Sequence, residues 1–153
     1  MAEIHSLMLE LGKRTGIGDL EFPRDHSLLL QFDNDCQVAF EHDSEDGALL
    51  VSGLLGSADP YRNADDYRSL LEASCLGSQT GGGSIALARE ANELLLWKRF
   101  NDTFPDYAAF ETAVNGFIAH LKEWREIIEK GPAANAASSD GAEGAFPAFG
   151  LKA

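Results

Sequence analysis

A long apolar stripe near the end of the chain is the feature that most limits its possible folds. The stripe consists of Phe110, Val114, Phe117, Leu121, Trp124 and Ile128. Intervals of four and three residues keep side chains on one side of an α-helix, here over about five turns. We therefore predict one amphipathic helix that ends at Lys130 and Gly131-Pro132 and needs a large apolar surface to cover.

Extended segments that supply such a surface precede this helix. They are SLLLQF (27–32), CQVAFEH (36–42), ALLVSGLL (48–55), SIALA (84–88) and ELLLWKRF (93–100). The first three are separated by short polar turns, which predicts an antiparallel meander. The last two are closed by residues 89–92 and are predicted to form a hairpin.

Two further helices are predicted in the first half of the chain. Ile4, Leu7, Met8 and Leu11 recur at helical spacing, and Gly16 is well placed to end that helix. A second helix is expected from about Asp65 to Cys75. Residues 1–130 therefore form the predicted domain.

The composition changes after Gly131. Residues 131–153 are rich in Ala, Gly and Ser, and we predict a disordered tail there. Phe146 and Phe149 stand out within this tail. They have two interpretations, a short docking motif or an incidental feature of the terminus.

The charge of the chain limits its partners. The 153 residues include 25 acidic and 12 basic side chains, for a formal charge of −13. Nucleic acid and anionic membranes would be repelled, so neither is an expected partner. Between Asp33 and Asp66 there are nine acidic residues and one base, Arg62. This excess can attract basic polypeptide, or it can simply keep the protein soluble.

Cysteine usage and hydropathy indicate the compartment. Cys36 and Cys75 lie in apolar contexts without a C-x-x-C spacing, which predicts buried thiols in a reducing compartment. Neither a signal peptide nor a run of about 18 apolar residues is visible. The sequence therefore predicts a cytoplasmic protein.

The sequence offers little support for catalysis or for a cofactor. The histidines, His5, His26, His42 and His120, show no metal-binding spacing, and neither cysteine has a neighbouring histidine. The acidic segments 33–35 and 43–47 fit hairpin turns better than calcium loops. The GGGS run at 81–84 lacks the lysine of a P-loop and fits a connection better than a phosphate site. No metal, cofactor or catalytic residue is predicted.

Two predicted strands carry more apolar surface than one covered face requires. Leu49–Val51 and Leu94–Trp97 are apolar at successive positions, whereas a half-exposed strand alternates. The predicted helices suffice to cover one face of a sheet. The other face then needs a second subunit or a bound polypeptide. A sheet that is well covered within one chain is the alternative.

The ordered set of segments resembles the class I type III secretion chaperones of the CesT/SycE type. The resemblance covers about residues 4–130. It rests on LELGKRTGIGDLEF (9–22), SLLLQFDNDCQVAFEHD (27–43), ALLVSGLLG (48–56), LLEASCLGSQTGG (70–82), LLLWKRF (94–100) and FIAHLKEWREII (117–128). The chain departs from the family at Ala73-Ser74-Cys75, where Ala-Asn is frequent, and in its tail. Both departures weaken the transfer of interface residues.

This resemblance implies an α+β fold with three helices packed on a twisted antiparallel sheet, assembled as a homodimer. It implies a non-enzymatic function without a cofactor. The dimer would hold the N-terminal chaperone-binding region of an effector extended and deliver it to the secretion apparatus, where an ATPase or export gate is a further expected partner. For the dimer contact we expect Leu70, Leu71, Ser74 and Cys75.

For contact with the effector we expect apolar positions on the strands and on the first helix. These are Leu7, Leu11, Leu28, Leu30, Val38, Phe40, Leu50 and Leu95. Val38 and Phe40 have a second interpretation as core residues. Two other functions stay open at this point, an adaptor or anti-activator that binds folded regulators, and a small enzyme or ligand-binding domain.

Overall fold

Five antiparallel strands form the main sheet of the protein. The computed structural model describes residues 2–22, 27–33, 35–43, 45–101 and 103–133. The strands are β2 (Ser27–Phe32), β3 (Cys36–His42), β4 (Leu49–Ser57), β5 (Ser84–Ala88) and β6 (Glu93–Phe100), in the order β2-β3-β4-β6-β5. The predicted meander and hairpin are both confirmed. The third strand extends to Ser57 instead of Leu55, since a bulge between Leu54 and Gly56 lets its pairing with β6 continue.

Three helices accompany this sheet, as predicted. They are α1 (Ile4–Thr15), α2 (Ala64–Ser74) and α3 (Tyr107–Lys130), and a short 3₁₀ turn, η1 (Cys75–Gly77), follows α2. Asn63 and Asp66 form a capping box at the start of α2, and the side chain of Asp106 accepts a hydrogen bond from the Ala109 N–H at the start of α3. Gly16 ends α1 in the left-handed conformation.

A small sheet outside the prediction joins the start of the chain to the segment that precedes α3. Its strands are β1 (Ala2–Glu3) and β7 (Thr103–Phe104), which pair in antiparallel fashion. Two residues are too few to produce a periodic pattern, so neither strand was predictable. The predicted tail lies outside the described residues from position 134 onward.

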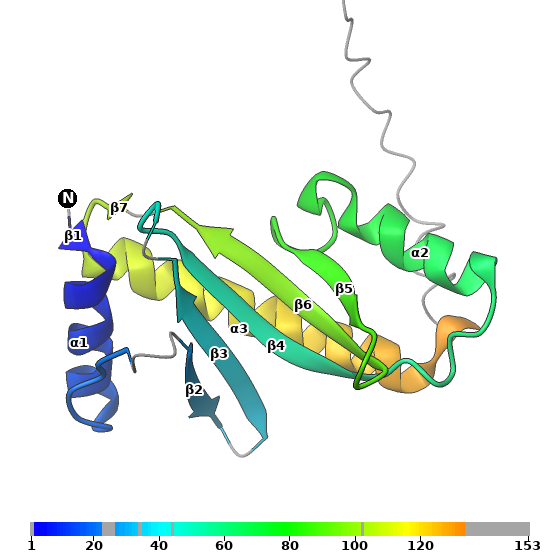
Figure 1. Cartoon of the computed structure of the whole chain (residues 1–153), viewed down its shortest axis with the longest axis horizontal. Coiled ribbons are helices and arrows are strands. Elements are labelled where there is room, and N and C mark those ends of the chain that lie inside the picture. The colour runs from blue at the N-terminus through cyan, green and yellow to red at the C-terminus, as the bar shows by residue number, and fades with distance from the viewer. Residues whose placement is uncertain (1, 23–26, 34, 44, 102, 134–153) are drawn as a thin grey trace, which may run out of the picture.

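Helix α3 covers one face of the main sheet, which it crosses from behind in Figure 1. All six residues of its predicted stripe are buried. The helix approaches the sheet closely at Gly53 of β4, where a Cβ atom would lie 2.3 Å from Leu121 Cδ2. Glycine at this position therefore lets the helix pack directly on the strand.

The helix α1 packs at the N-terminal end of α3 and depends on another close approach. Gly12 lies in the interior of α1, and a Cβ atom there would lie 2.0 Å from the carbonyl oxygen of Gly18. The chain folds back here because the N–H groups of Ile17 and Gly18 both donate to the Gly12 carbonyl, at 3.0 and 3.1 Å. Helix propensity thus favours alanine at position 12, whereas packing requires glycine there.

We expect Gly12→Ala to destabilise the protein by about 1–3 kcal/mol, because the new methyl group overpacks the turn against backbone. Propensity alone would make the same change stabilising by about 0.5–1 kcal/mol. Gly116→Ala in α3 is the matched control, since nothing lies within 4 Å of its Cβ position. Urea unfolding at one protein concentration measures both changes. A stabilised Gly12→Ala variant would contradict the packing argument.

Candidate functional site

One face of the main sheet is left uncovered by the described helices. In Figure 1 this face points toward the viewer, on the side of β4 and β6 away from α3. We call it the open face and define it by the side chains that the strand register places opposite to the α3 side. Its apolar and small residues are Leu29, Ala39, Leu50, Ser52, Leu54, Ala86, Leu95 and Trp97.

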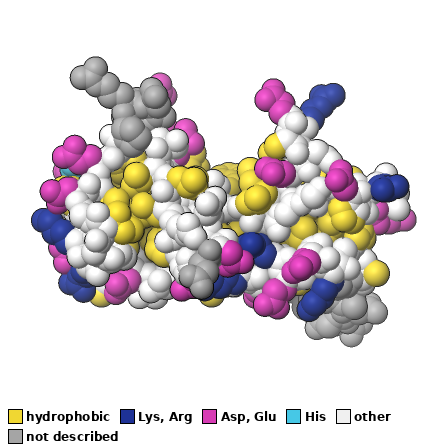
Figure 2. Space-filling view, turned by 90° about the horizontal axis from the view of Figure 1, so that it is seen from below, with side chains coloured by type: hydrophobic (Ala, Val, Ile, Leu, Met, Phe, Trp, Pro, Cys, Tyr) yellow, Lys and Arg dark blue, Asp and Glu magenta, His cyan; other side chains and the backbone are white. Residues whose placement is uncertain are grey.

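Apolar side chains on the open face are exposed to an unusual degree. Leu29 is 62% exposed, Leu54 44% and Trp97 40%. The register aligns Leu29, Ala39, Ser52 and Trp97 in one row across four neighbouring strands. A row of this kind is a surface on which an extended polypeptide can bury side chains. The space-filling view shows apolar areas alternating with acidic side chains on the side of the molecule that it displays (Figure 2).

The sheet also has a free edge beside the open face. β2 pairs with β3 on one side and with no other described strand on its opposite side. The other outer strand, β5, is partly covered by α2, because the Ile85 N–H donates to Ser74 Oγ at 3.0 Å. Within the described residues, β2 is therefore the better edge for adding a strand.

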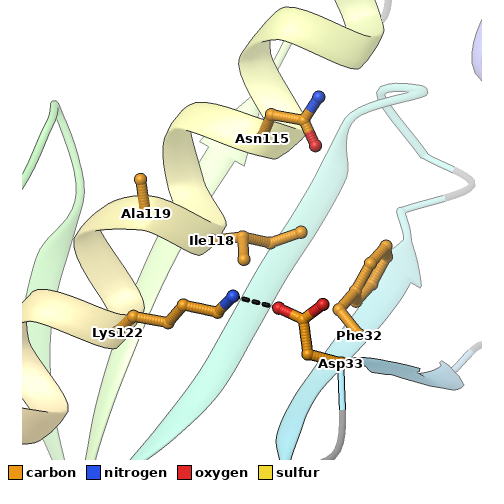
Figure 3. A pocket seen from close by; sticks show the side chains of 6 residues that line it. All are labelled: Phe32, Asp33, Asn115, Ile118, Ala119 and Lys122. Atoms are coloured by element: carbon orange, nitrogen blue, oxygen red, sulfur yellow. Dashed lines mark hydrogen bonds and ion pairs between the residues drawn. The ribbon is translucent and has the colours of Figure 1, made fainter.

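A cleft of about 370 Å³ lies between the end of β2 and α3. Phe32 and Ile118 form its apolar wall, while Asn115 stands at one end (Figure 3). Lys122 and Asp33 form an ion pair across the other end. The cleft has room for an apolar side chain of a segment that lies along β2, and its polar rim can bind the backbone of such a segment.

A second apolar surface lies on the outer side of α2. Leu71 and Leu76 are 69% and 77% exposed, and Cys75 between them is also exposed. Leu71 and Cys75 lie one turn apart on the same side of the helix. We call Leu71, Cys75 and Leu76 the α2 patch.

The residues predicted for effector contact fall into two groups. Leu7, Leu11, Leu30, Val38 and Phe40 are buried in the core of the chain itself, which agrees with the second interpretation of Val38 and Phe40. Leu50 and Leu95 lie on the open face and are partly exposed, and Leu28 is partly buried at the α3 side of β2. Surface for a partner is therefore available at three of the eight positions.

The residues predicted for the dimer contact also include both buried and surface positions. Leu70 is 3% exposed and faces the core, whereas Leu71 and Cys75 lie on the surface. Ser74 is half-buried. Its hydroxyl donates to the Leu70 carbonyl at 2.9 Å and accepts from the Ile85 N–H of β5. The prediction of a buried Cys75 thiol is wrong, since this residue follows the last core-facing position of α2, Ala73.

Several surface residues were absent from the sequence-based prediction. Leu29, Leu54, Leu76 and Trp97 are among them. The sequence held no signal for the orientation of Trp97, because residues 94–97 are all apolar, and the structure places this side chain opposite to the buried Leu94 and Leu96. Leu76 gave no signal either, because it adopts a positive φ of 52° after the helix has ended.

The described residues contain no cluster suited to metal binding. No group of three or more His, Cys, Asp or Glu side chains is placed to hold a metal ion among them. Burial raises the pKa of the Cys36 thiol, which keeps it protonated and unreactive at neutral pH. Within the same residues, no helix is both long and apolar enough to cross a membrane.

The fold and its surfaces define a small α+β domain with an open sheet face and a free strand edge. Comparison with known families agrees with this description. The family described as Tir chaperone protein (CesT) matches residues 6–125. The chain belongs to this family, as the sequence analysis predicted.

Three solved complexes contain a chain with the same fold. A chain of the ExsC-ExsE complex aligns over 82% of this chain and 96% of its own length, with 16% identity and a TM-score of 0.70. One of the HopA1-SchA chaperone-effector complex aligns over 79% and 91%, with 16% identity and a TM-score of 0.66. The third is the Yersinia pestis type III secretion chaperone SycH in complex with a fragment of YscM2, with 78% and 98% coverage, 16% identity and a TM-score of 0.60. No curated protein sequence matches the chain.

Proposed function

We propose that the protein is a cytoplasmic type III secretion chaperone that binds the N-terminal segment of an effector and holds it extended. Membership of the Tir chaperone family supports this function. The observation that carries it is the row across the open face, in which the large apolar side chains of Leu29 and Trp97 are exposed. An isolated soluble domain gains nothing from such a row, whereas an extended polypeptide can bury it.

The free edge of β2 and the open face suit an unfolded segment better than a folded domain. Ordering an extended segment costs roughly 1–2 kcal/mol per residue in backbone entropy. Burial of apolar surface offsets this at about 25 cal/mol per Å². A long contact is therefore needed, in which backbone hydrogen bonds form along β2 and side chains enter the cleft beside Phe32 and the row on the open face.

The function needs neither catalysis nor a nucleotide in this proposal. The acidic surface would limit association between loaded molecules and attract basic stretches of the effector or of the export machinery, including its ATPase or gate. We further propose a homodimer formed through the α2 patch. Leu71 and Leu76 are the two most exposed large apolar residues of the described chain, and a second copy would cover them.

Co-purification from the host that encodes the chain tests the effector proposal. We expect a secreted protein to co-elute, and limited proteolysis to leave a protected fragment from its N-terminal region. Trp97→Asp should release this fragment, because a charge replaces a large exposed apolar side chain of the open face. Ala91→Asp adds the same charge at the exposed β5–β6 turn and should retain it.

Two results would contradict this proposal. One is protection of a folded domain of the partner with no protected N-terminal segment, which is the behaviour of an adaptor or anti-activator. The other is equal binding by the Trp97→Asp and Ala91→Asp variants, which would place the contact away from the open face.

A further inference from the structure

We propose that residues 146–151 of the same chain, FPAFGL, dock on the open face when no other polypeptide covers it. The open face presents a surface with large exposed side chains at Leu29, Leu54 and Trp97. Residues 134–153 contain three large apolar side chains, Phe146, Phe149 and Leu151, and all of them lie in this short segment. The open face and residues 146–151 are therefore both apolar and belong to the same molecule.

The end of α3 lies close to the start of the open face. Ile128 Cγ2 is 3.3 Å from the position of a Cβ atom on Gly56 of β4. Gly56 is two residues from Leu54, which belongs to the open face. Gly131 is buried, so the place from which the chain continues is fixed.

The intervening chain is long enough to pass from one face of the sheet to the other. Residues 134–145 can span up to about 40 Å when extended. Passing around the end of a sheet requires on the order of 10 Å, the usual separation of packed layers. A further four residues along β4, from Gly56 to Ser52, add about 13 Å and reach the row that contains Trp97. The extended length of residues 134–145 is therefore greater than the length of the path to this row.

Charge also favours this segment over the preceding part of the tail. Residues 146–153 include one basic residue, Lys152, and no acidic one, whereas residues 134–145 contain Asp140 and Glu143. The open side of the sheet carries Glu41 and Glu93, and its base, Arg99, is already paired with Asp43 and Asp46. An uncharged apolar segment next to one base is thus compatible with this surface, whereas an acidic segment would be repelled by it.

Docking within the chain would shield the open face and set a threshold for entry of another polypeptide. A tethered segment binds at a high effective concentration, so even a weak contact keeps the surface occupied. An incoming chain then binds only if its longer contact displaces the segment. This regulatory role rests on the proposed function, whereas the docking itself does not.

The two tryptophans provide a direct test in the full-length protein without any effector. Trp97 lies on the open face, while Trp124 is 2% exposed in the core. In the Phe146→Ser/Phe149→Ser variant we expect acrylamide quenching of Trp97 to rise about twofold, since the indole returns to water. Ala136→Ser/Ala137→Ser, in the polar part of the tail, is the matched control and should leave the quenching unchanged. A Trp97→Phe background should abolish the difference between variants.

A photo-crosslinking residue at position 149 identifies the occupant independently. Light and heavy isotope-labelled proteins are mixed before irradiation. We expect crosslinks to residues of β4 and β6 within one chain. Equal quenching in all variants would overturn the proposal, and so would crosslinks that join light to heavy chains, which would identify a second copy as the occupant. Neither result would bear on effector binding, which the co-purification experiment tests.

Discussion

Trp124→Ala is expected to lower the free energy of unfolding by about 3–5 kcal/mol, the range for removing a buried aromatic side chain. Trp124 is 2% exposed, and its Nε1–H donates to the Gln79 carbonyl at 2.9 Å. The substitution therefore leaves a cavity under α3 and an unpaired carbonyl in the loop after α2. Since a domain of this size is typically stable by about 5–15 kcal/mol, a large share of the total is at risk.

Trp124→Phe separates the two causes of this effect. It retains most of the ring packing and removes the hydrogen-bond donor, so we expect a loss of about 1–2 kcal/mol. Urea unfolding followed by far-ultraviolet circular dichroism at one protein concentration measures both variants. Equal losses for the Ala and Phe variants would show that the hydrogen bond, and not the packing of α3, dominates.

Leu71→Asp/Leu76→Asp is expected to convert the proposed homodimer into a monomer at micromolar concentration. Two charges would replace the most exposed apolar side chains of the α2 patch, and burying an unpaired charge in an interface costs several kcal/mol. Light scattering coupled to size-exclusion chromatography gives the molecular mass. Both side chains are more than two-thirds exposed, so the fold of the single chain should be retained.

Ala91→Asp/Ala108→Asp is the matched control for this change. It adds the same charge at two exposed positions, one in the β5–β6 turn and the other in the first turn of α3. We expect this variant to remain dimeric. If both double variants keep the mass of the parent protein, the α2 patch is not the dimer contact. A parent protein that is already monomeric would remove the homodimer from the proposed function.

The sequence predicted elements well where one periodicity dominates. The stripe from Phe110 to Ile128 has a single helical interpretation, and α3 follows it. The strand β3 was equally clear, because Val38 and Phe40 alternate against Gln37 and Glu41 and are fully buried. In both cases the apolar pattern itself states which side of the element faces the core.

The orientation of the strands was harder to predict where apolar residues occupy both faces. In SLLLQF, three consecutive leucines leave the choice between Leu29 and its neighbours undetermined. The structure buries Leu30 and exposes Leu29. The same ambiguity explains why buried and surface leucines were mixed in the predicted contacts. The packing of α3 on the sheet decides which leucines are buried. This packing depends on contacts between residues far apart in the sequence.

The strand order has a consequence for the folding of the newly made chain. The central strand β4 is complete at Ser57, but its partner β6 begins only at Glu93, and α3 extends to Lys130. During synthesis, β4 therefore emerges from the ribosome with one edge unpaired and both of its sides bare. The first half of the domain can form its local hairpins early. Its hydrophobic core can close only after nearly the whole folded domain has been translated.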